Sequence, residues 1–111
     1  MSEWEVTYSE QAELDLRGIF EYIALSLLEP EVAKRQTVRI LEAIQKLNAL
    51  PMRFRLYDKE PWHSRGLRVL PVDNYSVFYL LTKKQRTVLI VRIMYGGRNI
   101  EEQLQDTYKR S

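Results

Sequence analysis

The chain has 111 residues, of which 45% are hydrophobic and 29% are charged, and this composition predicts one compact domain over residues 1–111. It contains no cysteine, which excludes disulfides and thiolate chemistry. No apolar run approaches the roughly 20 residues that span a bilayer. The acidic first five residues lack the apolar stretch of a signal peptide. We therefore expect a soluble cytoplasmic protein without membrane contact.

The formal net charge of +2 is unevenly distributed along the chain. Residues 1–50 carry five Lys and Arg against nine Asp and Glu, whereas residues 51–111 carry twelve against six. The first part therefore has a net charge of −4 and the second of +6. A basic half suggests an anionic partner, either nucleic acid or an acidic protein segment, and ordinary surface charge is the alternative.

The N-terminal half begins as a strand and continues as a helix. Residues 4–8 alternate apolar and polar side chains, as a short strand does. Ser9 stands at an N-cap position, and Glu10 and Glu13 suit the positive end of the helix dipole. Apolar residues then recur at spacings of three and four, which predicts an amphipathic helix to about Leu27. These residues are Ala12, Leu16, Ile19, Phe20, Ile23, Ala24 and Leu27.

A second helix follows after a very short connection. Pro30 and Glu31 suit its first turn, and Pro51 lies just beyond its expected end near Asn48. The short connection predicts that the two helices pack as an antiparallel hairpin. The helical period is continued by Ala33, Thr37, Ile40, Leu41, Ile44 and Leu47.

The C-terminal half reads as a small sheet. Residues 52–65 show no clean period and predict a loop. Three runs with strand character follow, separated by short turns that imply an antiparallel meander. Residues 99–108 predict a short helix or tail. Together with the first strand, the expectation is an α+β domain with an antiparallel four-stranded sheet. The expected strands are residues 66–72, 75–81 and 87–95.

The last strand carries an arginine among apolar residues. A buried unpaired charge is costly, so Arg92 must reach solvent, a carboxylate or a phosphate. We expect the sheet to present its cations on one face. Alternation places one set of residues on the helices, namely Leu89, Val91, Ile93 and Tyr95. The other face then holds Val88, Ile90, Arg92 and Met94.

Arg68, Arg92 and Arg98 are the candidates for contact with an anionic partner. Gly96 and Gly97 precede Arg98 and would allow a close approach of a partner backbone. The alternatives are an internal salt bridge for Arg92, a solubilising edge charge for Arg68, and a pair with a nearby glutamate for Arg98.

Three further side chains are weighed against their structural roles. Tyr79 and Tyr95 are expected to pack in the core or on the sheet, with stacking on a partner as the alternative for both. The single histidine, His63, is an acid–base candidate, although an incidental loop position is the alternative. The spacing of acidic residues and histidine indicates no metal site. Gly96 and Gly97 alone do not form a phosphate-binding loop, and we expect no cofactor.

The order strand, helical hairpin and three antiparallel strands, together with residues 66–68, 75–79 and 92–98, resembles the RelE/ParE toxin superfamily. The resemblance covers roughly residues 5–104. It implies a RelE/ParE-like fold and a growth-inhibiting toxin of a type II toxin–antitoxin module, of the kind also called plasmid stabilisation proteins. A cognate antitoxin would neutralise the toxin by wrapping its surface. Both a homodimer and a hetero-oligomer with the antitoxin stay open.

The two branches of this superfamily imply different mechanisms. RelE-like toxins cleave messenger RNA on the ribosome without a metal, using cations and a proton-transfer group. In that branch an arginine follows the tyrosine that opens the third strand, where this chain has Ser76. Arg98 matches the arginine after the glycine turn, but the tyrosine expected about six residues later falls on Leu104. Two positions that the resemblance implies for catalysis are therefore occupied by residues unsuited to it.

The ParE-like branch inhibits DNA gyrase and needs no such residues. Its long helical hairpin, its Gly-Leu-Arg-like entry to the sheet and its final Arg-Ile-x-Tyr-Gly-x-Arg motif match this chain better. The ParE-like reading therefore leads. A metal-independent, ribosome-dependent endoribonuclease remains the alternative, with Arg68, Arg92, Arg98 and His63 as candidate catalytic residues. A third reading is a degenerate, non-toxic member that only binds its antitoxin. Antitoxin or target contacts are predicted for Arg68, Arg92, Tyr95 and Arg98.

Overall fold

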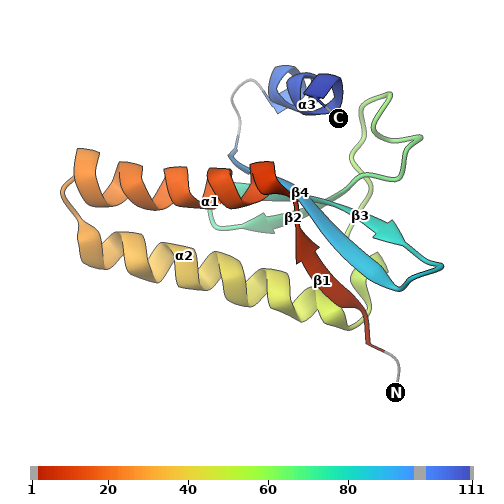
Figure 1. Ribbon diagram of the computed structural model, residues 1–111, viewed down its shortest axis with the longest axis horizontal. Helices are drawn as coiled ribbons and strands as arrows, with labels where there is room; N and C mark the ends of the chain where they lie inside the picture. Colours follow the sequence, from red (N-terminus) through yellow and green to blue (C-terminus); the bar gives the residue numbers. More distant parts are fainter. Residues whose placement is uncertain (1–2, 97–99, 111) are drawn as a thin grey trace.

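The computed structural model describes residues 3–96 and 100–110, and for residues 107–110 it describes the backbone alone. The domain is α+β, with a helical hairpin on one side of a four-stranded sheet and a short C-terminal helix (Figure 1). The strands are β1 (Glu5–Tyr8), β2 (Arg68–Val72), β3 (Tyr75–Thr82) and β4 (Thr87–Tyr95). The helices are α1 (Glu10–Glu21), α2 (Pro30–Gln45) and α3 (Ile100–Arg110). This architecture confirms the predicted fold class.

The helical hairpin begins and turns where the sequence indicates. The Ser9 side chain accepts a hydrogen bond from the Ala12 N–H at 3.0 Å and so caps α1. A π-helix over Tyr22–Ser26 extends α1 to the turn, where Leu28 adopts a left-handed conformation with φ of 57°. Pro30 then opens α2, since its missing N–H is not needed in a first turn. A short 3₁₀ segment, Lys46–Asn48, completes the second helix.

The strand order is β1-β4-β3-β2, and β2, β3 and β4 form the predicted antiparallel meander. The expectation of an entirely antiparallel sheet is wrong, because β1 pairs parallel with β4. The hairpin returns the chain to the end of the sheet where β1 starts, where the Trp4 N–H donates to the Asn48 carbonyl at 2.8 Å. From there β2 runs in the direction of β1, and the alternation of the meander gives β4 that direction too.

The sheet separates two hydrophobic clusters. The larger cluster joins the helical hairpin to one face of the sheet through residues such as Ile40, Ile44 and Tyr79. The smaller cluster lies on the opposite face and includes Phe78 and Leu104 of α3. Neighbouring residues of β3 point to opposite faces, which accounts for the division.

A β-bulge changes which residues of β4 face the helices. Phe78 pairs with Arg92 whereas Tyr79 pairs with Ile90, so Val91 is an extra residue in the ladder. Simple alternation fails across such a bulge. Val88, Ile90 and Ile93 pack in the helix-side cluster, while Val91 and Met94 pack in the other. The expectation was therefore right for Ile93 and wrong for Leu89 and Val91, which do not belong to the helix-side cluster. It was also wrong for Val88 and Ile90, which were expected on the other face and pack toward the helices.

Candidate functional site

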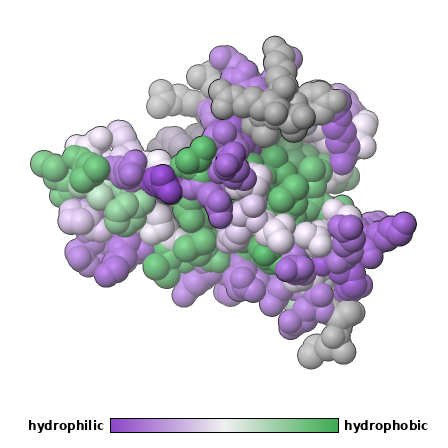
Figure 2. All heavy atoms as spheres, viewed as in Figure 1, coloured by the Kyte–Doolittle hydropathy of each residue, from purple (hydrophilic) through white to green (hydrophobic). Residues whose placement is uncertain are grey.

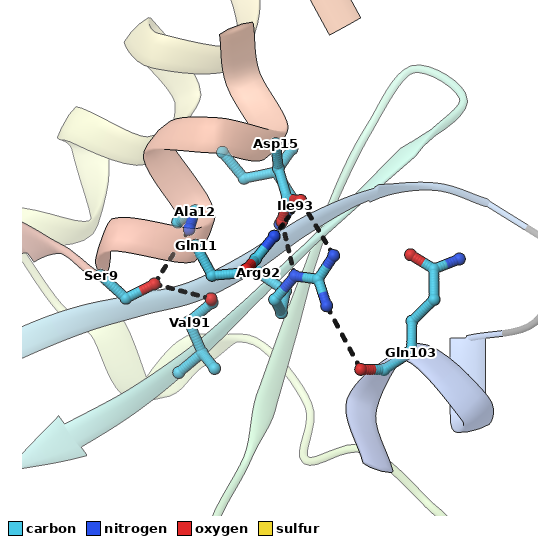
Figure 3. A network of polar contacts seen from close by, with 8 residues as sticks. All are labelled: Ser9, Gln11, Ala12, Asp15, Val91, Arg92, Ile93 and Gln103. Atoms are coloured by element: carbon cyan, nitrogen blue, oxygen red, sulfur yellow. Dashed lines mark hydrogen bonds and ion pairs between the residues drawn. The ribbon is translucent and has the colours of Figure 1, made fainter. Parts of the chain in front are cut away.

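Arg92 forms a buried ion pair between the sheet and α1. Its Nε donates to Asp15 Oδ2 at 2.7 Å and its Nη2 donates to Asp15 Oδ1 at 2.9 Å. Each of the two side chains is only 10% exposed. Nη1 also donates to the Gln103 carbonyl of α3 at 3.2 Å (Figure 3). The internal salt bridge, left open from the sequence, is therefore the role that the structure shows for Arg92.

Asp15 completes the edge of β4 as well as pairing with Arg92. The pairing of β1 with β4 ends at Ile90, so the following residues of β4 lack a neighbouring strand on that side. Asp15 Oδ2 accepts the Ile93 N–H at 2.9 Å, and Ser9 Oγ donates to the Val91 carbonyl at 2.8 Å. Side chains of the first helical turns thus replace strand partners there (Figure 3).

Arg68 is committed to a different part of the molecule. Its Nη1 donates to the carbonyls of Phe54 at 2.6 Å and Met52 at 3.1 Å, which fastens the loop after α2 to the sheet. Arg68 pairs with Tyr79, whose side chain lies in the helix-side cluster, whereas Arg92 pairs with a residue of the opposite cluster. Directly opposed residues share a face, so the two arginines point to opposite faces. The expectation that the sheet presents its cations on one face is therefore wrong.

The two tyrosines differ in exposure. Tyr79 is fully buried and its hydroxyl donates to the Pro51 carbonyl at 2.6 Å, which confirms its predicted core position. Burial raises the pKa of Tyr79 to about 12. Tyr95 is 56% exposed and packs edge-to-face on Tyr75, with ring centroids 5.5 Å apart. Tyr95 remains available to a partner, and its contact with one stays a prediction.

In the part of the chain that the structure describes, the remaining candidate residues do not come together in one site. His63 is exposed, and its Nδ1 lies 2.9 Å from the Tyr57 carbonyl, to which a protonated Nδ1 donates. Leu104 is buried in the smaller hydrophobic cluster as an anchor of α3. Arg98 lies outside the described residues. Across residues 3–96 and 100–110, no group of three or more His, Cys, Asp and Glu could hold a metal ion.

A groove of about 550 Å³ runs between α1 and α2 beside the end of β1. Phe20 and Leu41, which the helical period assigns to the core, are each 39% exposed. The sheet covers only part of the apolar surface of α1 and α2. The uncovered part of that surface lines the groove. The groove is lined by Tyr8, Glu13, Leu16, Arg17, Phe20, Thr37 and Leu41.

Further apolar side chains are exposed at the turn of the hairpin, where Figure 2 shows hydrophobic residues at the tip of the molecule. Leu25 is 70% exposed and Leu28 is 78% exposed. This surface was missed from the sequence, although three leucines among the four residues 25–28 are more than one helix face can bury. No helix in the described part of the chain is long and apolar enough to cross a membrane.

Comparison with protein families decides the assignment. Residues 6–100 match the model of the ParE toxin of the type II toxin–antitoxin system parDE. The chain belongs to the ParE toxin family. It is therefore the toxin of a type II toxin–antitoxin module, which has an antitoxin as its cognate partner. No curated protein sequence matches this toxin significantly.

Solved structures show the same fold for this ParE-family toxin. A chain of the chromosomal ParDE system of P. aeruginosa superposes with a TM-score of 0.70 at 20% identity, over 86% of this chain and 98% of that chain. A chain of the RelBE2 complex of Mycobacterium tuberculosis gives 0.61 at 19% identity, over 86% and 93%. A chain of the archaeal RelE–RelB complex of Pyrococcus horikoshii gives 0.59 at 18% identity, over 88% and 99%. At these identities the likeness establishes the fold alone.

Proposed function

We propose that this toxin acts by inhibiting DNA gyrase. The observation that carries the proposal is the commitment of Arg68 and Arg92 to internal partners on opposite faces of the sheet. A metal-independent ribonuclease needs cations that converge on one scissile phosphate. It also needs a group that transfers protons. Two arginines separated by the sheet do not meet the first requirement.

The C-terminal helix supports the same choice. Leu104 stands where the RelE-like branch would carry a tyrosine, and it is buried as a packing residue of α3. Ser76 likewise replaces an expected arginine. The match to the ParE family model agrees with this reading. The endoribonuclease remains the alternative, since RelE toxins share the fold, and Arg98 and His63 are its remaining candidates.

A paired assay tests the proposal. Purified toxin is incubated with gyrase and relaxed plasmid, and separately with ribosomes programmed with messenger RNA. We expect supercoiling to be inhibited and the message to stay intact, and we expect the cognate antitoxin to restore supercoiling. Specific cuts in the A-site codon with unaffected supercoiling would replace the proposal by the ribonuclease. No effect in either assay would favour a non-toxic antitoxin-binding member.

We further propose that the antitoxin occupies the groove between α1 and α2. The groove combines an apolar lining, which includes Leu16, Phe20 and Leu41, with two charged side chains of opposite sign, Glu13 and Arg17. An amphipathic segment with apolar residues toward the groove and a carboxylate near Arg17 fits this chemistry. The antitoxin contact predicted for Arg92 on the sheet face is replaced accordingly, because Arg92 is buried and already paired with Asp15.

A further inference from the structure

One end of the molecule gathers cations from separate parts of the chain. This end, here called the basic end, consists of residues 3–5, 46–55 and 82–87. These segments contain six Lys and Arg but only two acidic residues, Glu3 and Glu5. Figure 2 shows hydrophilic side chains gathered at the lower right of the molecule, where the turn between β3 and β4 and the start of β1 lie in Figure 1. The six cations are Lys46, Arg53, Arg55, Lys83, Lys84 and Arg86.

Backbone contacts hold these segments together. The Glu5 N–H donates to the Arg86 carbonyl at 2.9 Å, which joins the start of β1 to the β3–β4 turn. The Trp4 N–H donates to the Asn48 carbonyl, which joins the same strand to the segment that begins with Lys46. The convergence is therefore a property of the fold and not of one charged run.

The cations of the basic end are exposed, and several are not engaged in ion pairs. Lys46, Lys83 and Lys84 form no salt bridge in the described part of the chain. By contrast, Arg39 pairs with Asp73 at 2.7 Å, and Arg92 pairs with Asp15. The lysines of the basic end therefore keep their charge available for an external anion.

The aromatic residues at this end are already occupied by the chain's own arginines. The Arg53 guanidinium lies 5.1 Å from the centre of the Phe54 ring, and that of Arg86 lies 5.0 Å from the Trp4 ring. Trp4 is buried and Phe54 is half-buried. Single-stranded nucleic acid is usually held by bases stacked on exposed aromatic rings. The basic end lacks such a free ring among its described residues, which favours contact with a duplex backbone.

We propose that the basic end binds the phosphodiester backbone of duplex DNA, without reading its sequence. Its biological meaning rests on the proposed function, because gyrase holds duplex DNA while it acts, and a toxin on that complex would meet both protein and DNA. Closely spaced phosphates on a duplex suit several cations spread over one surface. None of the residues that line the groove belongs to the basic end, so the proposed sites for antitoxin and for DNA use different residues.

The hairpin provides a matched control. Lys34 and Arg35 are exposed cations near the start of α2, and α2 runs from the hairpin turn toward the basic end. From Lys34 to Lys46 the chain advances about 18 Å along a helix axis. Replacing Lys34 and Arg35 by glutamine removes the same charge as replacing Lys83 and Lys84, but it leaves the basic end unchanged.

The test measures binding of the toxin to a fluorescent 30-base-pair duplex of mixed sequence by anisotropy, at several salt concentrations. For the Lys83→Gln/Lys84→Gln variant we expect affinity to fall about tenfold near 0.1 M salt, and the slope of log K against log salt to shrink by about 2. The Lys34→Gln/Arg35→Gln control should keep affinity within about twofold, as expected for cations that touch no phosphate. Equal losses in both variants would show a net-charge effect and overturn the proposal.

Two further measurements distinguish duplex DNA from other anionic partners, and DNA binding from gyrase inhibition. A labelled acidic peptide of equal charge, bound more tightly than the duplex at the same salt, would overturn the proposal in favour of a protein partner. Preference for a single strand of the same length would overturn it too. The duplex assay contains no gyrase. It therefore tests DNA binding by the basic end even if the toxin does not inhibit supercoiling. If supercoiling is inhibited, we expect the Lys83→Gln/Lys84→Gln variant to need more toxin than the control variant does.

Discussion

Asp15 serves the fold with both of its carboxylate oxygens. Oδ1 accepts from Arg92, and Oδ2 accepts from both Arg92 and the Ile93 N–H. The carboxylate thus compensates a buried guanidinium and an unpaired backbone donor at once. A buried ion pair need not stabilise more than apolar residues of the same shape, but losing one partner leaves an uncompensated charge. The pair therefore makes the position of β4 relative to α1 specific.

We expect Asp15→Ala to lower the free energy of unfolding by about 3–5 kcal/mol, because it strands the buried Arg92 guanidinium. Urea denaturation measures the loss. Glu21→Ala, which removes an exposed carboxylate from the same helix, should change stability by less than about 0.5 kcal/mol. A double variant, Asp15→Leu/Arg92→Met, should recover part of the loss, because it removes the stranded charge but leaves the Ile93 N–H without its acceptor. A loss under about 1 kcal/mol for Asp15→Ala would contradict the role assigned here.

Truncating apolar side chains should destabilise the protein to different extents in α1 and in α2. Ile44 is fully buried, so Ile44→Ala should cost about 2–5 kcal/mol of unfolding free energy. Ile19 is only partly buried and should cost less when replaced by alanine. Leu25→Ala, at the exposed hairpin turn, serves as the control and should be nearly silent. Urea denaturation measures these losses of unfolding free energy. A loss below about 0.5 kcal/mol for Ile44→Ala would contradict the core position of Ile44 in α2.

At the scale of the elements, the hairpin is more apolar than its packing on the sheet requires. Ala12, Ile40 and Ile44 meet the sheet, whereas Phe20 and Leu41 are left beside the groove. Exposed apolar residues that lie together on a folded protein usually mark an interaction surface. The excess is therefore the feature of the hairpin that carries the proposed antitoxin site.

Replacing Leu41 by serine should weaken antitoxin binding by about tenfold or more, since it removes apolar area from the groove. Isothermal titration with the purified cognate antitoxin measures the change. Met52→Ser alters a comparably exposed apolar residue that does not line the groove, so it should leave the affinity unchanged. Equal affinity for the wild-type toxin and the Leu41→Ser variant would place the antitoxin elsewhere.

The turn between β2 and β3 is tied to α2 by charge. Asp73 accepts hydrogen bonds from Arg39 at 2.7 and 2.8 Å and from Gln36 at 2.9 Å. These bonds, led by that of Arg39, lower the pKa of Asp73 to about 2. The pKa is lower in the folded than in the unfolded chain. The pair therefore stabilises the fold above a pH of about 4, and this contribution is lost as the pH falls toward 2.

Asp73→Asn tests this dependence, and asparagine also tolerates the left-handed backbone of this position, where φ is 55°. We expect the variant to unfold at lower urea than the wild type at pH 7. The difference in midpoint should shrink steadily as the pH is lowered from about 4 to 3. Lys34→Gln, which removes an exposed cation elsewhere on α2, should show no such convergence. A difference that stays constant with pH would contradict the assigned pair.

At the scale of the whole molecule, the two ends differ in chemistry. The hairpin turn is apolar, whereas the opposite end is basic, and the sheet between them holds its two inner arginines in internal contacts. The charge asymmetry noted in the sequence therefore corresponds to an arrangement in space. Under our two proposals, apolar contacts dominate recognition of the antitoxin at the groove, and charge dominates recognition of DNA at the basic end.

Much of the fold was predictable because its signals are local. The cap at Ser9, the proline that opens α2 and the bounds of β4 depend on neighbouring residues, and the structure confirms them. The partner of Arg92 was not predictable, since Asp15 lies 77 positions away. The bulge at Val91 also lacks a local marker, and it reverses which residues face the helices. The opposite facing of Arg68 and Arg92 follows from register, which alternation within single strands cannot supply.

The parallel pairing of β1 with β4 has a consequence for the timing of synthesis. Residues 5–8 find their partner only at residues 87–90, and β4 lies inside the sheet between β1 and β3. A nascent chain that stops before Thr87 lacks a central strand and cannot assemble this sheet. Contacts so distant along the chain also form slowly. The sheet can therefore close only after Thr87–Tyr95 has been synthesised, so this toxin reaches its fold late in its own translation.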